Sequence, residues 1–464
     1  MNKFIARSVF AGGIAVLLSA SVVRADVTLL AIGELDGSRA GDQADLSGLT
    51  YKLENGAAAN LLGGLGSGLA YAGGNAFLAL PDRGPNAVPF DSNIDDTVSY
   101  INRFHTITMD LDPNHSGSGL PYKLTPTLRA TTLLWSLTPL VYGSGDGQVG
   151  NGAPKINNFL QHFFTGRSDN FKLGENSGFA SDARFDTEGI RVSNDGLSVF
   201  ISDEYGPYVY QFSRITGVRL RTFQLPSSFF VANLSSQGAV EISGNTTGRT
   251  ANKGMEGLAI TPDGKTLVGI MQAALIQDAS SGGKKLLRIV TIDIASGKTT
   301  HQYAYKLTTG SGVSELCALN NTEFLVDERD GDGRANGDDA VNKQLYKINL
   351  AGATDVSAMN GADALSNAVS KTLFLDLVAA LTANGIAAGN IPAKIEGVAI
   401  GPDIRHGGNT LHTLWIANDN DFLSTVPDAN NVMIPNPNQF FVFGFSDDDL
   451  EGTKLIRQFS GFWF

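Results

Sequence analysis

The chain has 464 residues, a formal net charge of −12 at pH 7 and only 17% charged residues. The negative charge, with no basic stripe to offset it, excludes binding to nucleic-acid phosphates and suits a protein that holds divalent cations. A single cysteine, Cys317, excludes an internal disulfide framework. Its place in an apolar run predicts a small buried side chain.

The first 25 residues predict a signal peptide that is cleaved before Asp26. Lys3 and Arg7 form a positive start, and the apolar run that follows is shorter than the roughly 20 residues of a membrane span. A membrane anchor is the alternative. No later segment is apolar enough to span a membrane, so we expect a periplasmic or secreted protein with no membrane span. Residues 26–464 are expected to form one domain.

Five units of the mature chain share one plan. In each, an alternating strand leads to a turn rich in Asn, Asp or Gly, and a second apolar strand ends at a polar tip. The clear copies begin at Glu188, Glu256 and Glu396, and degenerate copies begin at Ser67 and Ser314. This pattern of repeated hairpins predicts one shared geometry.

The repeats, with further strands between them, predict an all-β fold. We expect a β-propeller of six or seven four-stranded blades, because a closed ring hides most strand edges. A jelly roll or sandwich is the alternative. Two insertions are expected: a loop over 142–183 with a short helix at 155–164, and helix-like apolar spacing over 362–383.

Acidic residues recur at both ends of the repeated hairpins. In a propeller the innermost strand starts at the mouth of the channel and the second strand returns there, so both ends face one rim. At the start of the innermost strand lie Glu188, Glu256 and Glu396. At the end of the second strand lie Asp82, Asp203, Glu204, Asp327, Glu328, Asn418 and Asp419. Turn and capping roles are the alternative for each residue taken alone.

Converging carboxylates repel one another unless a cation lies among them. Hard oxygen ligands predict calcium, with magnesium or manganese as alternatives. A second candidate calcium site is the acidic loop 327–340, in which glycines let the chain fold around an ion. Its candidate ligands are Asp330, Asp332, Asn336, Asp338 and Asp339. The loop lacks the order of an EF-hand, and a solvated acidic turn is equally compatible with it.

Two arginines sit at equivalent tips of the repeats, Arg83 and Arg329. A guanidinium there could balance the carboxylates or bind an anionic substrate with two hydrogen bonds. A structural ion pair is the alternative. Tyr205 and Gln272 follow the tips of their own repeats and could line the same mouth.

Four separated motifs resemble one known family. The stretches "DTEGI…SDEYGPYVYQF", "NKGMEGLAITPDGKTL", "FLVDERDGDG" and "KIEGVAI…LWIANDNDF" are similar to the secreted bacterial phytase-like family, also labelled "esterase-like activity of phytase". The likeness runs from about residue 47 to 445 and implies a propeller rich in Asp and Glu with phosphoester hydrolysis as its activity. It reaches Glu188, Asp203, Glu204, Glu256, Glu328, Arg329, Asp330, Glu396, Asn418 and Asp419. Ser314 and Met271 depart from the acidic pattern.

The leading hypothesis is a monomeric calcium-dependent hydrolase that acts on a small anionic phosphate ester. The expected metal ligands are Glu188, Asp203, Glu256, Glu328, Asp330, Asp332, Glu396, Asn418 and Asp419. Glu204 or Glu256 is the expected general base, and Arg83 or Arg329 would stabilise the developing charge. A non-catalytic binding propeller with structural calcium and a lactone or carboxyl-ester hydrolase are the alternatives.

Overall fold

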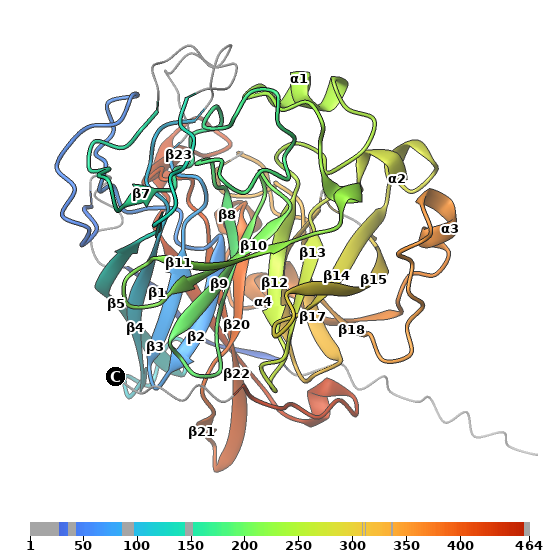
Figure 1. Ribbon diagram of the computed structural model, residues 1–464. Helices are drawn as coiled ribbons and strands as arrows, with labels where there is room; N and C mark the ends of the chain where they lie inside the picture. The colour runs from blue at the N-terminus through green and yellow to red at the C-terminus, as the bar shows by residue number, and fades with distance from the viewer. Residues whose placement is uncertain are drawn as a thin grey trace, which may run out of the picture.

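Five four-stranded antiparallel sheets surround one axis in the computed structural model, which describes residues 27–35, 43–85, 97–143, 152–308, 310, 312–335 and 337–458 (Figure 1). The predicted signal peptide at 1–25 lies outside the described residues. Within the described ranges, no helix is long and apolar enough to cross a bilayer.

The first four sheets each come from one continuous segment. From the innermost strand outward they are β2 (Gly68–Gly73), β3 (Ala76–Leu80), β4 (Arg103–Pro113) and β5 (Tyr122–Leu133); β8 (Thr187–Val192), β9 (Ser198–Asp203), β10 (Tyr208–Ser213) and β11 (Arg219–Gln224); β12 (Met255–Ile260), β13 (Thr266–Met271), β14 (Leu286–Asp293) and β15 (Lys298–Lys306); and β16 (Gly312–Ala318), β17 (Glu323–Arg329), β18 (Lys343–Asn349) and β19 (Lys371–Asp376).

The fifth sheet joins the two ends of the described chain. Its strands are β20 (Ile395–Ile400), β22 (Asn409–Asn418), β25 (Gln439–Phe445) and β1 (Thr28–Glu34), and β21 (Ile404–His406) extends β22 as a projecting hairpin. Because β1 pairs with β25, the N-terminal strand completes the sheet that the C-terminal strands begin, and this pairing closes the ring.

The innermost strands confirm the predicted propeller. Each of β2, β8, β12, β16 and β20 contacts two others, in a cycle that returns from β20 to β2. The described residues form five blades, whereas the sequence predicted six or seven. The five repeated hairpins account for all five inner strand pairs. The remaining length goes into long outer strands, such as β4 and β5 of 11 and 12 residues, and into insertions.

The insertions lie in several places around the propeller: β7, β23, α1 and α2 lie toward the top of Figure 1, α3 lies at the side, and α4 lies near the middle. They comprise α1 (Gly238–Ser243), α2 (Ile276–Ser280), α3 (Gly361–Leu365), α4 (Leu377–Ala383), three 3-10 turns (Ser227–Phe229, Ala388–Asn390, Asp448–Leu450) and the short pairs β6 (Trp135–Ser136) with β7 (His162–Phe163) and β23 (Thr425–Pro427) with β24 (Met433–Pro435).

Only one of the two predicted helical insertions is helical. The predicted helix at 155–164 is wrong, since these residues form turns and β7. The apolar spacing over 362–383 does form helix, but β19 separates α3 from α4. The Asp376 side chain caps α4 by accepting a hydrogen bond from the Ala379 amide at 2.9 Å.

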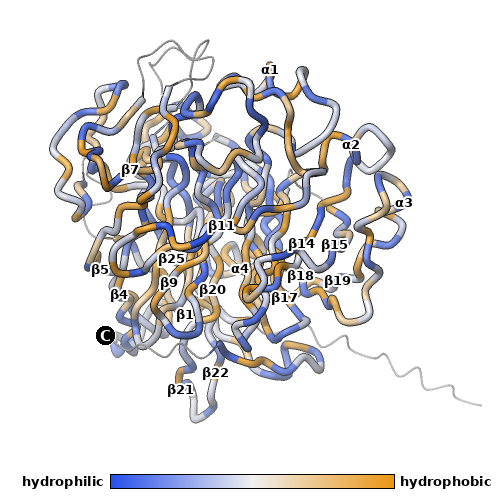
Figure 2. The backbone as a smooth tube through the Cα atoms, in the orientation of Figure 1, coloured by the Kyte–Doolittle hydropathy of each residue, from blue (hydrophilic) through white to orange (hydrophobic). Residues whose placement is uncertain are grey.

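The hydrophobic pattern separates inner from outer strands. Every residue of β8 and β12 is buried, whereas β11 at the edge of its blade is largely exposed or half-buried. In Figure 2 hydrophobic colour follows the central strands, and the tip of the β21–β22 hairpin is pale to blue. Cys317 is 6% exposed within the core, as its sequence context predicted.

The repeats carry a glycine where neighbouring inner strands meet most closely. These glycines are Gly68, Gly189, Gly257 and Gly397, each following the first residue of its repeat. A Cβ built on Gly189 would lie 2.7 Å from the Leu258 amide nitrogen of the next inner strand, and the other three would meet similar obstacles. The Glu-Gly signature therefore marks a narrow neck just below the mouth of the channel. The fourth blade has Glu315 at this position.

An arginine and a glutamate fill the channel below this neck. Arg191 donates hydrogen bonds to backbone carbonyls of four inner strands, at Leu69, Ile190, Leu316 and Val398. The Glu315 Oε1 atom lies 3.0 Å from the Arg191 guanidinium and accepts the Leu258 amide of the fifth inner strand at 3.1 Å. This buried ion pair ties all five inner strands together, and nothing in the repeat pattern predicted it.

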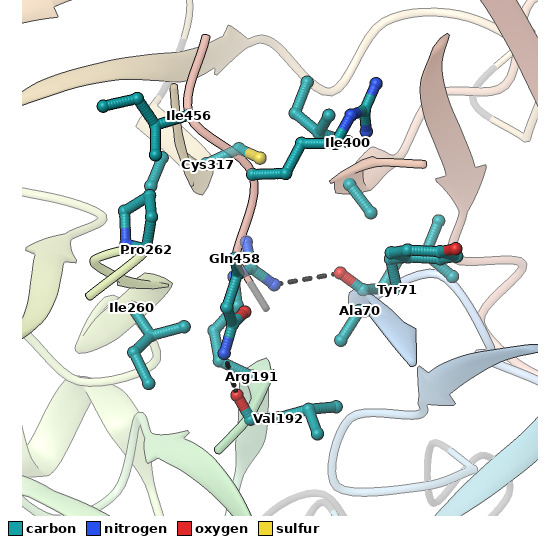
Figure 3. Close-up of a pocket in the computed structure, with 14 residues that line it drawn as sticks. Ala70, Tyr71, Arg191, Val192, Ile260, Pro262, Cys317, Ile400, Ile456 and Gln458 are labelled. Atoms are coloured by element: carbon teal, nitrogen blue, oxygen red, sulfur yellow. Dashed lines mark hydrogen bonds between the residues drawn. The ribbon is translucent and has the colours of Figure 1, made fainter. Parts of the chain in front are cut away.

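A cavity of about 90 Å³ lies at the far end of the channel, beneath Arg191 (Figure 3). Its walls include Ala70, Cys317 and Ala399, which occupy the same position in their repeats as Arg191 does in its own. The C-terminal segment crosses this end, and the Gln458 side-chain amide donates to the Val192 carbonyl at 2.7 Å. The ion pair therefore separates this cavity from the mouth.

We expect Arg191→Met to lower the free energy of unfolding by about 3–5 kcal/mol, because it leaves Glu315 buried without its counter-charge. Urea unfolding of the single variants and of Arg191→Met/Glu315→Met measures the coupling. The double variant should lose less stability than the sum of the two single losses. The exposed Arg129→Met control should cost under about 1 kcal/mol. Additive losses would contradict a coupled ion pair.

Candidate active site at the propeller mouth

A polar cavity of about 100 Å³ opens at the mouth of the channel. It is lined by Ser67, Asp82, Arg83, Glu188, Glu204, Asn252, Glu256, Gln272, Arg329, Lys394, Glu396 and Asp419. Both ends of the repeated hairpins contribute. Four repeats contribute the first residue of their hairpin to the lining, and all five contribute a residue from the tip. The structure thus brings together residues that lie more than 330 positions apart in the chain.

At three of the acidic tips, only one of two adjacent residues reaches the cavity. Glu204, Arg329 and Asp419 line it, whereas their neighbours Asp203, Glu328 and Asn418 do not. Successive side chains of a strand point to opposite sides, which separates the two residues at these three tips. Asp82 and Arg83 lie beyond the end of β3, and both line the cavity.

The neighbours that turn away hold the backbone of the mouth in place. The Asp203 Oδ1 atom accepts the amides of Asp186 at 3.1 Å and Tyr205 at 2.9 Å. The Asn418 Oδ1 atom accepts the Gln439 amide at 2.7 Å. Glu328 accepts hydrogen bonds from the Tyr305 hydroxyl and the Lys371 ammonium. Side-chain oxygens of Asp203, Asn418 and Glu328 thus accept hydrogen bonds from other groups of the protein.

The acidic loop is built around a lysine ammonium. Lys343 Nζ lies 2.6 Å from Asp330 Oδ1 and donates to the carbonyls of Asp330 at 3.0 Å and Asp332 at 2.9 Å. Neither aspartate lines the mouth cavity, and Asn336 lies outside the described residues. The ammonium thus supplies the positive charge at the centre of this loop.

A first group of carboxylates lies on the side of the second blade. Asp186, Glu188 and Glu204 each offer an oxygen, and these oxygens lie within 4.8 Å of one another. The three residues are 1%, 7% and 3% exposed. Asp186 precedes Glu188 by two positions, so strand alternation places both on the same side. The Glu204 Oε1 atom accepts the Gly254 amide at 2.9 Å.

Glu256 completes this group. Its Oε1 atom accepts the Gln272 side-chain amide at 2.7 Å, and its Oε2 atom is buried with no donor group among the described residues. Burial, and then the charge of Glu204, raise the pKa of Glu256 well above its ordinary value.

The other carboxyls of the group also resist ionisation. Burial, followed by the charge of Asp186, raises the pKa of Glu204 to about 7. Burial and the charge of Glu256 raise the pKa of Glu188 well above its ordinary value. These shifts are the cost of bringing several carboxyls into a buried space without enough positive charge to match them.

A second group, Asp82, Asp419 and Asp421, already contacts a cation of the protein. The Lys394 Nζ atom lies 2.9 Å from Asp419 Oδ2 and 2.5 Å from Asp421 Oδ1. Sequence reasoning missed Lys394. It lies two positions before Glu396, as Asp186 lies two positions before Glu188, and strand alternation at these positions is the signal that could have found both.

The two predicted arginines line the cavity at separate points of its rim. Arg83 contacts Asp186, with an Nη1–Oδ2 distance of 3.0 Å, and also donates to Asn252. Arg329 donates to the Ser314 hydroxyl at 2.6 Å and forms an ion pair with Glu396. Gln272 lines the cavity as well. Tyr205 does not, because its hydroxyl donates to the Gly166 carbonyl at 3.0 Å.

Comparison with known families gives one match that spans most of this chain. The family model described as "Phytase-like: Esterase-like activity of phytase" matches residues 60–422. That range includes every residue that lines the mouth cavity.

Individual relatives are more distant. An "uncharacterized secreted protein" of Arthroderma benhamiae is 35% identical over 185 residues, which cover 32% of this chain and 35% of that protein. Among solved structures, a gluconolactonase from Xanthomonas campestris has 10% identity, covers 91% of this chain and 99% of that chain, and gives a TM-score of 0.30. A putative 6-phosphogluconolactonase from Bacteroides uniformis has 11% identity, covers 81% and 88%, and also gives 0.30. Identities and TM-scores this low carry no information on activity.

We expect the stability of the cation-free protein to fall as pH rises from about 5 to 8. Burial raises the pKa of Glu204 to about 7 and that of Asp203 to about 8, whereas the unfolded chain releases these protons near pH 4. Between these values the native state binds more protons, so ionisation favours unfolding. Calorimetry in chelator should show a melting temperature a few degrees lower at pH 8 than at pH 5. A higher value at pH 8 would contradict these shifts.

Proposed function

The chain belongs to the phytase-like family, and on this premise we propose that it is a divalent-cation-dependent hydrolase of phosphate esters. The observation that carries the proposal is the first carboxylate group. The oxygens of Asp186, Glu188 and Glu204 lie within 4.8 Å of one another, and the buried Glu256 Oε2 atom beside them has no donor among the described residues. Unless a cation neutralises them, the carboxylates of this group repel an anionic ester.

The donor set fits a hard divalent cation. All four side chains offer carboxylate oxygens, and none offers sulfur or imidazole, which favours calcium over zinc. Magnesium and manganese are the alternatives. Because burial already raises the carboxyl pKa values, a cation at neutral pH would displace protons that otherwise neutralise the group. The second group has less need of an ion, since Lys394 contacts two of its members.

The cationic side chains of the rim are suited to hold the ester. Arg83 and Arg329 approach the cavity from different blades, and Lys394 lies between the second carboxylate group and Glu396. Together they can bind phosphoryl oxygens and stabilise the charge that develops on them. A bound cation would polarise the phosphoryl group and acidify a water molecule. Glu256, whose Oε2 atom faces no donor among the described residues, is placed to accept the proton from that water.

A cavity beside the carboxylates favours catalysis over a purely structural cation. A structural ion is enclosed by protein ligands on all sides, whereas Glu188, Glu204 and Glu256 all border space that a substrate can enter. The activity test distinguishes this proposal from the two alternatives, a non-catalytic binding propeller and a lactone or carboxyl-ester hydrolase.

We also propose that the protein is exported and acts as a monomer. The N-terminal pattern at 1–25 predicts a signal peptide, and the relative from Arthroderma benhamiae is described as secreted. An exported protein meets millimolar calcium far more often than a cytosolic one, which suits a cation site of moderate affinity.

Purified protein should hydrolyse phosphomonoesters or phosphodiesters in calcium and lose at least about 100-fold in kcat/KM after chelation, with recovery when calcium is restored. Glu256→Gln should lose a similar factor at saturating calcium, because it removes the proton acceptor. Turnover that survives chelation would contradict the cation mechanism. Activity on lactones alone would replace the proposed substrate class, and no turnover on any ester would favour the binding propeller.

We expect Glu188→Gln to melt at a higher temperature than the parent protein in chelator at pH 8, because it removes a buried charge. Calcium should then stabilise it less. For the parent, a hundredfold excess of calcium over Kd adds about 2.7 kcal/mol, which is a few degrees for a chain of this size. Asp330→Asn/Asp332→Asn, outside the cavity, is the matched control and should keep the full gain from calcium. An equal gain in Glu188→Gln would argue against this site.

A further inference from the structure

Residues 454–458 cover the end of the channel that lies opposite the mouth. Figure 3 shows Ile456 and Gln458 of this segment beside the cavity of about 90 Å³ that Cys317 and Arg191 also line. We call residues 454–458 the lid and this space the lower cavity. No residue of the lid belongs to a helix or a strand. The lower end of the channel is therefore covered by irregular backbone, not by a sheet.

The lid is tied to three different blades by hydrogen bonds. The Ile456 amide donates to a carbonyl of the fourth blade at 2.8 Å. The Arg457 guanidinium donates to a carbonyl of the fifth blade, and the Gln458 side-chain amide donates to one of the second blade at 2.7 Å. The three acceptors belong, in this order, to Leu319, Gly401 and Val192. These polar contacts keep the lid closed.

The lid is fixed at its start and more loosely held beyond it. Thr453, the residue before the lid, is 5% exposed, and its hydroxyl donates to Glu323 at 2.7 Å. Within the lid, Ile456 is 46% exposed, and Arg457 and Gln458 are half-buried. A segment that buries little apolar surface opens at a lower free-energy cost than the whole fold. Thr453 is thus placed as the hinge about which the lid opens.

The ring of blades is closed by other contacts. β1 pairs with β25 along the fifth blade, and the buried ion pair of Arg191 with Glu315 joins the inner strands. Neither contact involves a residue of the lid. Opening of the lid therefore leaves both closures of the ring in place.

Cys317 is the chemical group that an open lid would expose. It is the single cysteine of the chain, and it is buried in the wall of the lower cavity. Leu455 of the lid packs against the hydrophobic cluster that contains Cys317. Burial raises the pKa of the thiol, so the thiol stays protonated and unreactive while the lid is closed.

We propose that residues 454–458 form a lid that opens by local unfolding about Thr453 while the five blades stay folded. The open lid admits small molecules from solvent to the lower cavity and to Cys317. The ion pair of Arg191 with Glu315 lies between this cavity and the mouth, so the two ends of the channel are reached separately. The inference is independent of the proposed function.

The rate at which iodoacetamide modifies Cys317 in the purified protein measures lid opening. Below the unfolding transition this rate should depend only weakly on urea, because lid opening exposes little surface. Arg457→Ala/Gln458→Ala removes two of the three ties to the blades and should speed the modification at least about tenfold. Lys454→Ala is the matched control, since its exposed side chain lies in the same segment, and it should keep the parent rate.

A variant that lowers global stability separates lid opening from unfolding. Leu286→Ala leaves a cavity in the third blade and should not change the modification rate in the absence of urea. Hydrogen exchange of the parent protein should be faster in the lid than in β25. The lid would be overturned by a urea dependence as steep as that of global unfolding, or by equal rates in the parent and Arg457→Ala/Gln458→Ala. Equal acceleration by Leu286→Ala, or equal protection of the lid and β25, would also overturn it.

Discussion

The close approach of five inner strands around one axis determines most of what is distinctive in this protein. At the neck, a side chain on Gly189 would collide with the backbone of the next strand, and the same crowding applies at Gly257 and Gly397. The residues just before these glycines have only one direction open to them, toward the mouth. Since three of these residues are glutamates, the crowding of the backbone also concentrates negative charge.

That concentration of charge has a free-energy cost, which the protein offsets unevenly. Below the neck, Arg191 neutralises Glu315 and satisfies carbonyls of four strands. At the mouth, Lys394 contacts two carboxylates of one group, while in the group around Glu188 the ion pair of the described residues is that of Asp186 with Arg83. Carboxylates without a counter-charge, at a rim whose other charges are paired, are typical of a binding site. A cation that binds there relieves the repulsion between the carboxylates, which the folded protein alone leaves uncompensated.

Much of the fold could be predicted from the sequence, because the hairpins repeat with local signals. The turn at Asn194-Asp195-Gly196 has Gly196 at a φ of 73°, and the matching Gly264 has 71°, so glycine marks both turns. The convergence of Glu188, Glu256 and Glu396 followed from topology alone. The number of blades could not be derived in this way, because long outer strands and insertions lengthen the spacing without adding a blade.

The parts of the site that escaped prediction depend on side-chain direction or on contacts distant in sequence. Neighbouring residues of a strand face opposite sides, so a shift of one residue decides whether Asp203 or Glu204 faces the mouth. Because both residues are acidic, the sequence does not show which of them does. Arg191 sits among small residues of other repeats, and only the folded ring shows that it fills their shared space. Lys343 lies at the start of β18, and its ammonium contacts Asp330, a contact that the loop sequence alone did not predict.

The most direct test is diffraction from crystals soaked in manganese, recorded for its anomalous signal. The predicted result is a peak at the mouth, in direct contact with carboxylate oxygens of Asp186, Glu188 and Glu204, with an open side toward the cavity. Crystals of Glu188→Gln should show a weaker peak. An empty mouth at saturating manganese, or a peak only beside Asp330 and Asp332, would contradict the assignment of this carboxylate group as the cation site.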